Sequence, residues 1–244
     1  MKNSFIRSVK ISLILVYSVI AAGSIVRMTG SGMGCPDWPK CFGYLIPPTE
    51  RAQLDWKPGH KYTKGQVIIL KEELRVANKN FSSSDSFDDD NWDLYTQHDY
   101  ALFNPYHTWI EYLNRLLGAL AGLAILIMTV LSFINWKKSI TYPFISTLIL
   151  LGMGFQAWLG KTVVDSNLAP YRISIHMIMA LLIVLGLIFL LFTVQKKIFS
   201  IPVNNTLKVW AWFALLLTLF QIVLGTQVRQ FIDLQMHEPS GKWL

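Results

Sequence analysis

The chain has 244 residues, of which 52% are hydrophobic and only 15% are charged, and its mean hydropathy is positive at +0.38. Soluble domains carry about 25% charged residues, so this composition excludes an ordinary soluble protein. A membrane-spanning helix needs about 17–25 mostly apolar residues. Five uncharged windows approach that length: residues 11–26, 116–136, 139–160, 173–195 and 209–228. The sequence therefore predicts an all-α integral membrane protein.

Positively charged residues are concentrated between alternate windows. They precede the first window, separate the second from the third and separate the fourth from the fifth: Lys2, Arg7, Lys10, Lys137, Lys138, Lys196, Lys197 and Lys208. Such clusters are typical of the cytoplasmic face, so the formal net charge of +7 does not indicate a nucleic-acid partner. We expect a cytoplasmic N-terminus, an external loop over residues 28–106 and an external C-terminus.

The first window ends in Ala21-Ala22-Gly23, which resembles a signal-peptidase site. A cleaved signal peptide is therefore one interpretation of this segment. Arg27 directly afterwards and the four later spans favour a retained helix. Cleavage would leave the topology of the remaining spans unchanged.

The external loop contains an acidic run that offsets its lysines and arginines. The run consists of Asp85, Asp88, Asp89, Asp90, Asp93 and Asp99. We interpret it as part of a solvated, partly flexible loop rather than as a metal site.

Cys35 and Cys41 are the only cysteines and follow the first window in the segment T-G-S-G-M-G-C-P-D-W-P-K-C. An external compartment is oxidising, so a disulfide between them is feasible. Such a disulfide is either a staple of the loop or a redox-active or substrate-facing pair, since small exposed bridges are the labile ones. Zinc binding is disfavoured because zinc normally takes four ligands.

Polar residues share one face of the second predicted helix. His107, Glu111, Asn114 and Gly118 follow helical spacing, and Arg115 lies beside them. Polar groups in a membrane helix normally face the bundle interior and mark function. The alternative is that they lie in the hydrated headgroup layer, which fits His107 better than the deeper Glu111.

The third and fifth windows end in the same motif, F-Q-x-x-L-G, at residues 155–160 and 220–225. Residues 225–229 also repeat the G-x-x-V-R pattern of residues 23–27. Repeats are common in membrane proteins of several spans. The fifth helix therefore resembles a second copy of the first helix.

His176 lies a little over one turn inside the fourth predicted helix, which starts at Pro170. No other ionisable residue follows it before Lys196. A lone histidine in such a helix favours a ligand role over a purely structural one.

Three motifs in this order resemble the heme A synthase family: G-x-x-V-R-x-T-G-S-G-x-x-C-P-D-W-P-x-C at residues 23–41, I-E-Y-x-N-R at residues 110–115 and Y-R-x-x-x-H at residues 171–176. The first motif is the most specific, and the resemblance is weakest between residues 50 and 104. It implies an eight-helix protein of two similar four-helix halves. Members oxidise a ring methyl of heme O to the formyl group of heme A, a cofactor of cytochrome oxidase. A heme b cofactor is held in the carboxy-terminal half.

The resemblance also assigns roles to individual residues. Glu111 matches the catalytic glutamate, and Cys35 and Cys41 match the loop cysteine pair of many bacterial members, which we group with it as catalytic. His176 matches a histidine that faces the heme iron. Arg27, Arg115 and Arg172 are then candidates for pairing with heme propionates.

Two features depart from the family pattern. Asn114 stands where members commonly have a histidine, and asparagine is a poor iron ligand. Either His107 replaces that histidine, or His176 alone holds the iron. The second departure is that the sequence ends soon after the fifth helix. We expect residues 1–197, including loop 28–106, to form the first four-helix half. Residues 198–244 would then form the fifth helix and an external tail that begin an incomplete second half.

Two other functions remain as alternatives. One is a non-catalytic heme-binding or assembly protein, and the other is a quinone-linked disulfide oxidoreductase, which generally needs two cysteine pairs. The resemblance implies a location in the bacterial plasma membrane, in contact with lipid. Its expected partners are heme O, heme A, heme O synthase and cytochrome oxidase assembly factors, and a homo-oligomer is left open.

Overall fold

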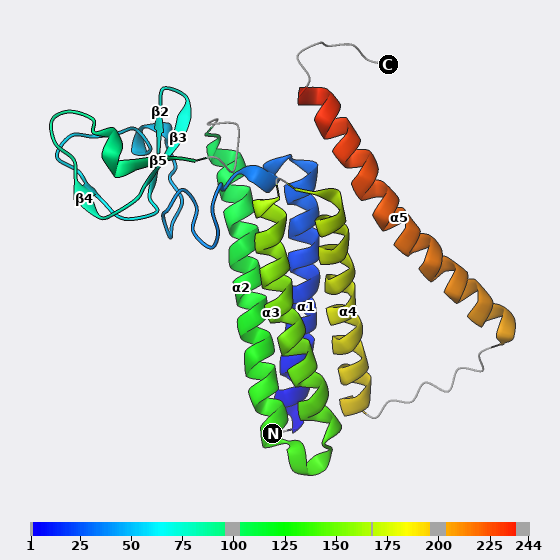
Figure 1. The fold of residues 1–244 in the computed structure, drawn as a ribbon. Helices are drawn as coiled ribbons and strands as arrows, with labels where there is room; N and C mark the ends of the chain where they lie inside the picture. Colours follow the sequence, from blue (N-terminus) through cyan, green and yellow to red (C-terminus); the bar gives the residue numbers. More distant parts are fainter. Residues whose placement is uncertain (1, 96–102, 167, 196–203, 238–244) are drawn as a thin grey trace. The chain divides into compact units, whose positions relative to one another are not determined.

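The computed structural model describes residues 2–95, 103–166, 168–195 and 204–237. Most of them form five long helices: α1 Lys2–Met28, α2 Pro105–Ile134, α3 Thr141–Asp165, α4 Pro170–Gln195 and α5 Asn205–His237 (Figure 1). All five are long and apolar enough to cross a membrane, which confirms the predicted all-α integral membrane fold. The boundary proposed at residues 197 and 198, the Lys196 and Lys197 pair, and the tail from residue 238 lie outside the described residues.

The start of α2 follows directly from its sequence. The Asn104 side chain accepts hydrogen bonds from the backbone N–H groups of Tyr106 (3.0 Å) and His107 (3.4 Å). N–H groups in the first turn of a helix have no carbonyl partner in that helix, so such a cap stabilises the helix start. Pro105 occupies the first helical position, where its missing N–H is not needed. These two residues therefore define the start of the helix.

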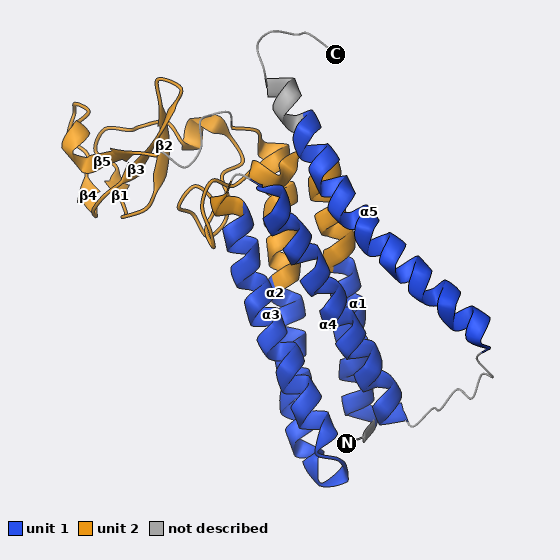
Figure 2. Cartoon of the chain, turned by 45° about the vertical axis from the view of Figure 1, so that its right-hand side comes forward, with its two compact units in different colours: residues 1–18, 119–163, 168–244 blue, residues 19–118, 164–167 orange. Residues whose placement is uncertain are grey.

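The chain divides into two compact units, coloured in Figure 2. Unit 1 contains residues 1–18, 119–163 and 168–244, and unit 2 contains residues 19–118 and 164–167. The four helices α1–α4 contribute segments to unit 1, together with α5. The beginning of α2 and the loop that connects α1 to α2 belong to unit 2, and the side of the membrane on which this loop lies stays a prediction.

Small polar side chains join the helices within unit 1. The Thr129 hydroxyl of α2 donates to the carbonyl oxygen of Ser146 on α3 (3.2 Å). The hydroxyl oxygens of Ser174 on α4 and Thr226 on α5 are 2.6 Å apart. Hydroxyl groups of this kind commonly bond helices to one another where water is scarce.

The loop between α1 and α2 in unit 2 contains two small antiparallel sheets, which the sequence did not indicate. Strands β1 Lys61–Tyr62 and β4 Phe81–Ser82 form one sheet, and β2 Val67–Leu70, β3 Glu73–Ala77 and β5 Trp92–Leu94 form the other, in the order β2-β3-β5. Four short 3₁₀ helices complete the described elements: η1 Ser31–Met33, η2 Arg51–Gln53, η3 Asp89–Asn91 and η4 Trp136–Lys138. The loop is thus a folded subdomain over much of its length.

Both faces of β2 are buried, because successive residues of a strand point to opposite sides. Val67 and Ile69 pack in a cluster with the two cysteines. Ile68 packs in a second cluster with Tyr62 and Trp92. The cysteine pair is therefore part of the core of the β-subdomain. Part of the acidic run is also ordered: the Asp88 side chain caps η3, and Asp89 pairs with Arg75 at 3.3 Å.

Candidate functional site

The segment that follows η1 comes close to the first turn of α2 because residue 34 is a glycine. A Cβ atom at Gly34 would collide with the backbone of His107 and would lie 2.7 Å from the Thr108 nitrogen. The Thr108 hydroxyl donates to the Gly34 carbonyl oxygen at 2.8 Å. Only glycine allows the two backbones to approach this closely.

Cys35 and Cys41 form a disulfide with an Sγ–Sγ distance of 2.06 Å, which confirms the predicted pair. Both residues are 0% exposed and pack against Phe42 and Leu54. The redox interpretation assumed a small exposed bridge, and this assumption is wrong. The bridge is buried because the β-subdomain packs around it.

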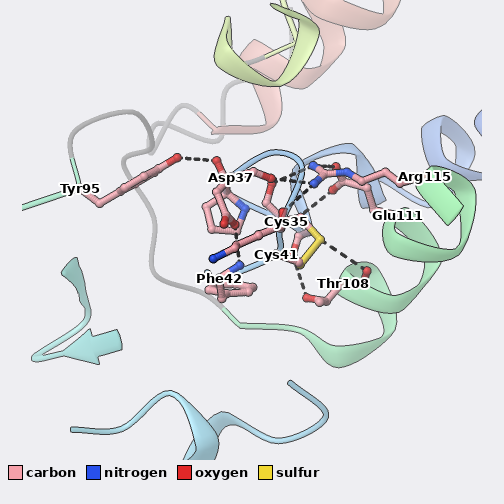
Figure 3. A network of polar contacts seen from close by, with 11 residues as sticks. Cys35, Asp37, Cys41, Phe42, Tyr95, Thr108, Glu111 and Arg115 are labelled. Atoms are coloured by element: carbon pink, nitrogen blue, oxygen red, sulfur yellow. Dashed lines mark hydrogen bonds and ion pairs between the residues drawn. A yellow bond between two sulfur atoms is a disulfide. The ribbon is translucent and has the colours of Figure 1, made fainter. Parts of the chain in front are cut away.

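The Glu111 side chain lies beside the disulfide and has a partner for each carboxylate oxygen (Figure 3). The backbone N–H of Cys35 donates to Oε2 at 2.9 Å, and Nη2 of Arg115 donates to Oε1 at 2.5 Å. Glu111 is only 4% exposed. A carboxylate so deeply buried in a membrane helix requires such partners, since its ionised form is otherwise strongly disfavoured.

Arg115 connects Glu111 to the cysteine segment. Its Nη1 donates to the carbonyl oxygens of Asp37 (2.6 Å) and Lys40 (3.0 Å), and its Nη2 also contacts the Cys35 carbonyl oxygen at 3.4 Å. The planar guanidinium presents several donors in a fixed fork, so one side chain can bind several carbonyls at once. The proposed pairing of Arg115 with a heme propionate stays a prediction, because here the guanidinium is bonded to the protein itself.

Asp37 holds the turn that contains Cys41. Its carboxylate oxygens accept hydrogen bonds from the backbone N–H groups of Phe42 (2.5 Å) and Gly43 (2.8 Å). Both residues have positive φ values, 56° and 78°. Burial raises the pKa of Asp37 above its usual value of 3.8, while these two N–H groups and the charge of Arg115 oppose the shift.

Tyr95, just after β5, donates its hydroxyl hydrogen to the Pro36 carbonyl oxygen (Figure 3). Burial is the main reason that the pKa of Tyr95 rises to about 12, and the charge of Asp37 adds to the effect. The hydroxyl therefore stays protonated and able to donate at neutral pH. This bond ties the β-subdomain to the cysteine segment.

The remaining candidates in unit 2 are Asn114, His107 and Arg27. Asn114 is directed toward α1, since its Oδ1 lies 4.0 Å from the position of a Cβ built on Gly23. That Oδ1 is buried and has no hydrogen-bond partner among the described residues. His107 and Arg27 are half-buried, at the start of α2 and near the end of α1. Their roles stay predictions.

His176 and Arg172 belong to unit 1. The His176 ring lies beside Gln156 of α3, and Arg172 donates to the carbonyl oxygen of Thr162 at 2.8 Å. The Nδ1 atom of His176 is buried without a hydrogen-bond partner among the described residues. A neutral imidazole in a helical bundle is a suitable axial ligand for heme iron, so His176 fits the heme that the resemblance implies.

The structure thus joins four of the predicted site residues, Cys35, Cys41, Glu111 and Arg115, in one network of unit 2. Asp37 was not predicted to be a functional residue, although it stands between the two cysteines in the T-G-S-G-M-G-C-P-D-W-P-K-C segment. Gln156 was noticed only as part of a repeated motif. Among the described residues there is no cluster of three or more His, Cys, Asp or Glu that would hold a metal ion.

The fold and the site define a class: a membrane protein of several helical spans, with a buried carboxylate clamped beneath a disulfide-closed loop. Residues 7–82 and 87–239 match the family model described as cytochrome oxidase assembly protein, COX15-CtaA. The chain therefore belongs to this family.

Curated relatives of the chain carry the name heme A synthase. The relative from Shewanella oneidensis is 24% identical over 218 residues, covering 88% of this chain and 54% of its own length. The relative from Bartonella tribocorum is 27% identical, covering 88% and 55%, and that from Rickettsia prowazekii is 24% identical, covering 93% and 62%. The chain thus spans little more than half of these relatives. No solved structure matches it significantly.

Proposed function

We propose that this chain supplies the Glu111-bearing half of a heme A synthase site, in which the ring methyl of heme O is oxidised to the formyl group of heme A. The observation that carries the proposal is the placement of Glu111. Its carboxylate is buried inside a membrane-spanning helix and held at both oxygens, by Cys35 and by Arg115. A structural role alone rarely retains an ionisable group at such a position.

The conversion of a methyl to a formyl group, with the oxygen supplied by water, releases four protons and four electrons. Each Glu111 oxygen uses one acceptor site for its present partner and keeps a second for a water molecule or a substrate proton. Glu111 would position the water and accept a proton as the methyl group is oxidised. Arg115 would hold the carboxylate in place and keep its charge compensated.

The imidazole of His176 would bind the heme iron. Arg27 and Arg172 are candidates for ion pairs with the heme propionates. A bound heme supplies the one-electron redox chemistry that amino-acid side chains lack. The amide of Asn114 is a poor iron ligand, so His107 would be the other candidate for binding the heme iron, or His176 would bind it alone. The electrons leave to an oxidant of the respiratory membrane, and the carboxy-terminal half of the relatives would hold the heme b.

The experiment follows heme conversion and heme binding separately. The full chain is produced in a bacterial host that makes heme O but has no heme A synthase, and the extracted hemes are quantified by chromatography. Glu111→Gln keeps the size of the side chain but removes its basicity. Glu50→Gln, at an exposed position of the external loop, is the matched control.

We expect heme A from the wild type and from Glu50→Gln, and at least about 100-fold less from Glu111→Gln, because removal of a general base typically costs 10²–10⁴ in rate. Equal conversion by Glu111→Gln would overturn the role of this carboxylate. Heme binding by the purified wild type without any heme A would overturn catalysis by this chain.

That last outcome would favour a second function, a non-catalytic heme-binding or assembly protein of the respiratory membrane. The observation in its favour is that the matched family model is described as a cytochrome oxidase assembly protein. A quinone-linked disulfide oxidoreductase is less well supported, since both cysteines are 0% exposed.

A further inference from the structure

The first copy of the motif F-Q-x-x-L-G lies on α3, and its glutamine contacts His176 of α4. The Nε2 atom of Gln156 lies 3.1 Å from the backbone carbonyl oxygen of His176 and 3.3 Å from the ring Nε2. Both residues belong to unit 1. A single amide group therefore contacts the histidine at two points.

The contact with the carbonyl oxygen determines which end of the amide faces His176. A carbonyl oxygen only accepts hydrogen bonds, so the amide group beside it must be the NH₂ end. The second hydrogen of that NH₂ group points to the ring, where Nε2 must then accept it. In the neutral imidazole the proton is consequently on Nδ1.

Other contacts of the ring do not select this tautomer. Nδ1 is buried and has no hydrogen-bond partner among the described residues. Gly160, one turn after Gln156, lies against the ring edge, where a Cβ atom on this glycine would be 3.5 Å from Cε1 of His176. Gly160 offers the ring no side-chain donor or acceptor, so the contact with Gln156 determines where the ring proton lies.

We propose that Gln156 is a positioning residue that keeps the Nε2 lone pair of His176 unprotonated and occupied by an amide N–H that heme iron would displace. This inference rests on the proposed heme-binding function. When iron binds Nε2, the long N–H···N contact is given up, while the bond from Gln156 to the His176 carbonyl oxygen remains. The amide is thus a placeholder for the metal in the ligand-free protein.

The chain offers a matched control in the second copy of the motif. Gln221 on α5 stands at the same position of the F-Q-x-x-L-G motif, but its side chain is exposed, as are Phe220 and Leu224. A substitution at Gln221 changes the same residue type in the same sequence context without touching His176.

The test uses the full-length protein in detergent, with ¹⁵N-labelled histidine, and compares the wild type with Gln156→Leu, Gln156→Asn and Gln221→Leu. Histidine tautomers are read from ring ¹⁵N chemical shifts without heme, and His176→Gln identifies the His176 signals. Heme affinity is then measured by optical titration. Unchanged signals from His60 and His107 show that each variant is folded.

We expect the wild type and Gln221→Leu to hold His176 as the Nδ1–H tautomer. Gln156→Leu and Gln156→Asn should give a mixture of tautomers and bind heme about three- to tenfold more tightly, because the ligand-free variants lack the one hydrogen bond that iron displaces. An unchanged tautomer in Gln156→Leu would overturn the inference. A changed tautomer with unchanged heme affinity would overturn the role toward iron. Failure of the wild type to bind heme would instead overturn the proposed function. The tautomer is measured without heme, so this result would be distinguishable from failure of the inference about Gln156.

Discussion

Glu111 and His176 both lie in membrane-spanning helices, yet their surroundings are opposite. Each oxygen of Glu111 has a short, charge-assisted or backbone hydrogen bond, and its partner Arg115 is bonded in turn to three carbonyl oxygens. The His176 ring has one long contact at Nε2, and its Nδ1 has no partner among the described residues.

The two positions differ in whether the protein alone supplies hydrogen-bond partners for their polar atoms. A buried charge is tolerated only when its partners are supplied by the fold, and for Glu111 the fold supplies all of them. A polar atom without a partner marks a strained or functional position in a native structure. Both Glu111 oxygens and its charge therefore have protein partners without a ligand, whereas the Nδ1 atom of His176 has none among the described residues.

The largest effect is expected for Arg115→Met, which breaks the complete network. Glu111 would keep a buried charge without its cation, and three carbonyl oxygens would lose a donor. Removing one partner of a buried ion pair costs about 3–5 kcal/mol. We expect a large drop in the temperature of unfolding in detergent and rapid proteolysis of the external loop.

Arg75→Met is the control for this variant, because Arg75 also pairs with two carboxylates, Glu73 and Asp89, but at the surface. Exposed pairs contribute about 0–1 kcal/mol. The double variant Glu111→Gln/Arg115→Met should recover part of the stability, since it leaves no unpaired charge. Equal stability of Arg115→Met and Arg75→Met would contradict the description of the network.

A smaller effect is expected when Cys35 and Cys41 are both replaced by serine. Loop entropy for a ring of this size corresponds to about 2 kcal/mol. The five helices do not depend on the bridge, so the variant should still accumulate in the membrane. Its external loop should be cleaved faster by protease than that of the wild type, and loss of the protein from the membrane would show that the bridge is needed for folding.

Asp37→Asn should cost about 1 kcal/mol, since one of the two N–H groups at Phe42 and Gly43 loses its acceptor. Because the pKa of Asp37 is raised on folding, the folded state binds more protons than the unfolded state between pH 3.8 and the raised value. Wild-type stability therefore falls as the pH rises through that window, and this contribution is absent in the variant.

The measurement is the unfolding temperature of both proteins between pH 4 and pH 7. The stability difference between them should be largest at the acidic end and should narrow as the pH rises. Asp55→Asn, at an exposed carboxyl group, should leave the stability unchanged. A difference that widens with pH would mean that the fold favours the ionised form of Asp37.

Much of the fold was predictable because long apolar windows leave few alternatives to spanning helices. The start of α2 was predictable for a local reason, the cap at Asn104 followed by Pro105. The β-subdomain was not predictable in this way. Its strands are two to five residues long, and β2 is a continuous apolar run without the alternation that identifies most strands.

The candidate site was predictable only in part. Glu111 and the two cysteines stand in recognisable motifs, so they were found. The role of Arg115 depends on the carbonyl oxygens of Asp37 and Lys40, which lie 78 and 75 residues away in the chain. Every residue has a carbonyl oxygen, so no sequence pattern announces such an acceptor.

The smallest effect is expected for His176→Leu, which tests whether the His176 side chain contributes little to the stability of the ligand-free protein. If the ring makes only one long hydrogen bond, its replacement by an apolar side chain of similar size costs little in the ligand-free protein. Gln156 keeps its bond to the backbone carbonyl oxygen of residue 176, and the unpartnered Nδ1 disappears. The expected change in the free energy of unfolding is within about 1 kcal/mol, in either direction. Unfolding of the heme-free variant in detergent measures it, with Arg115→Met beside it as the destabilised reference. A loss as large as that of Arg115→Met would mean that His176 is a structural residue in a network as complete as that of Glu111, and the contrast between the two positions would no longer hold.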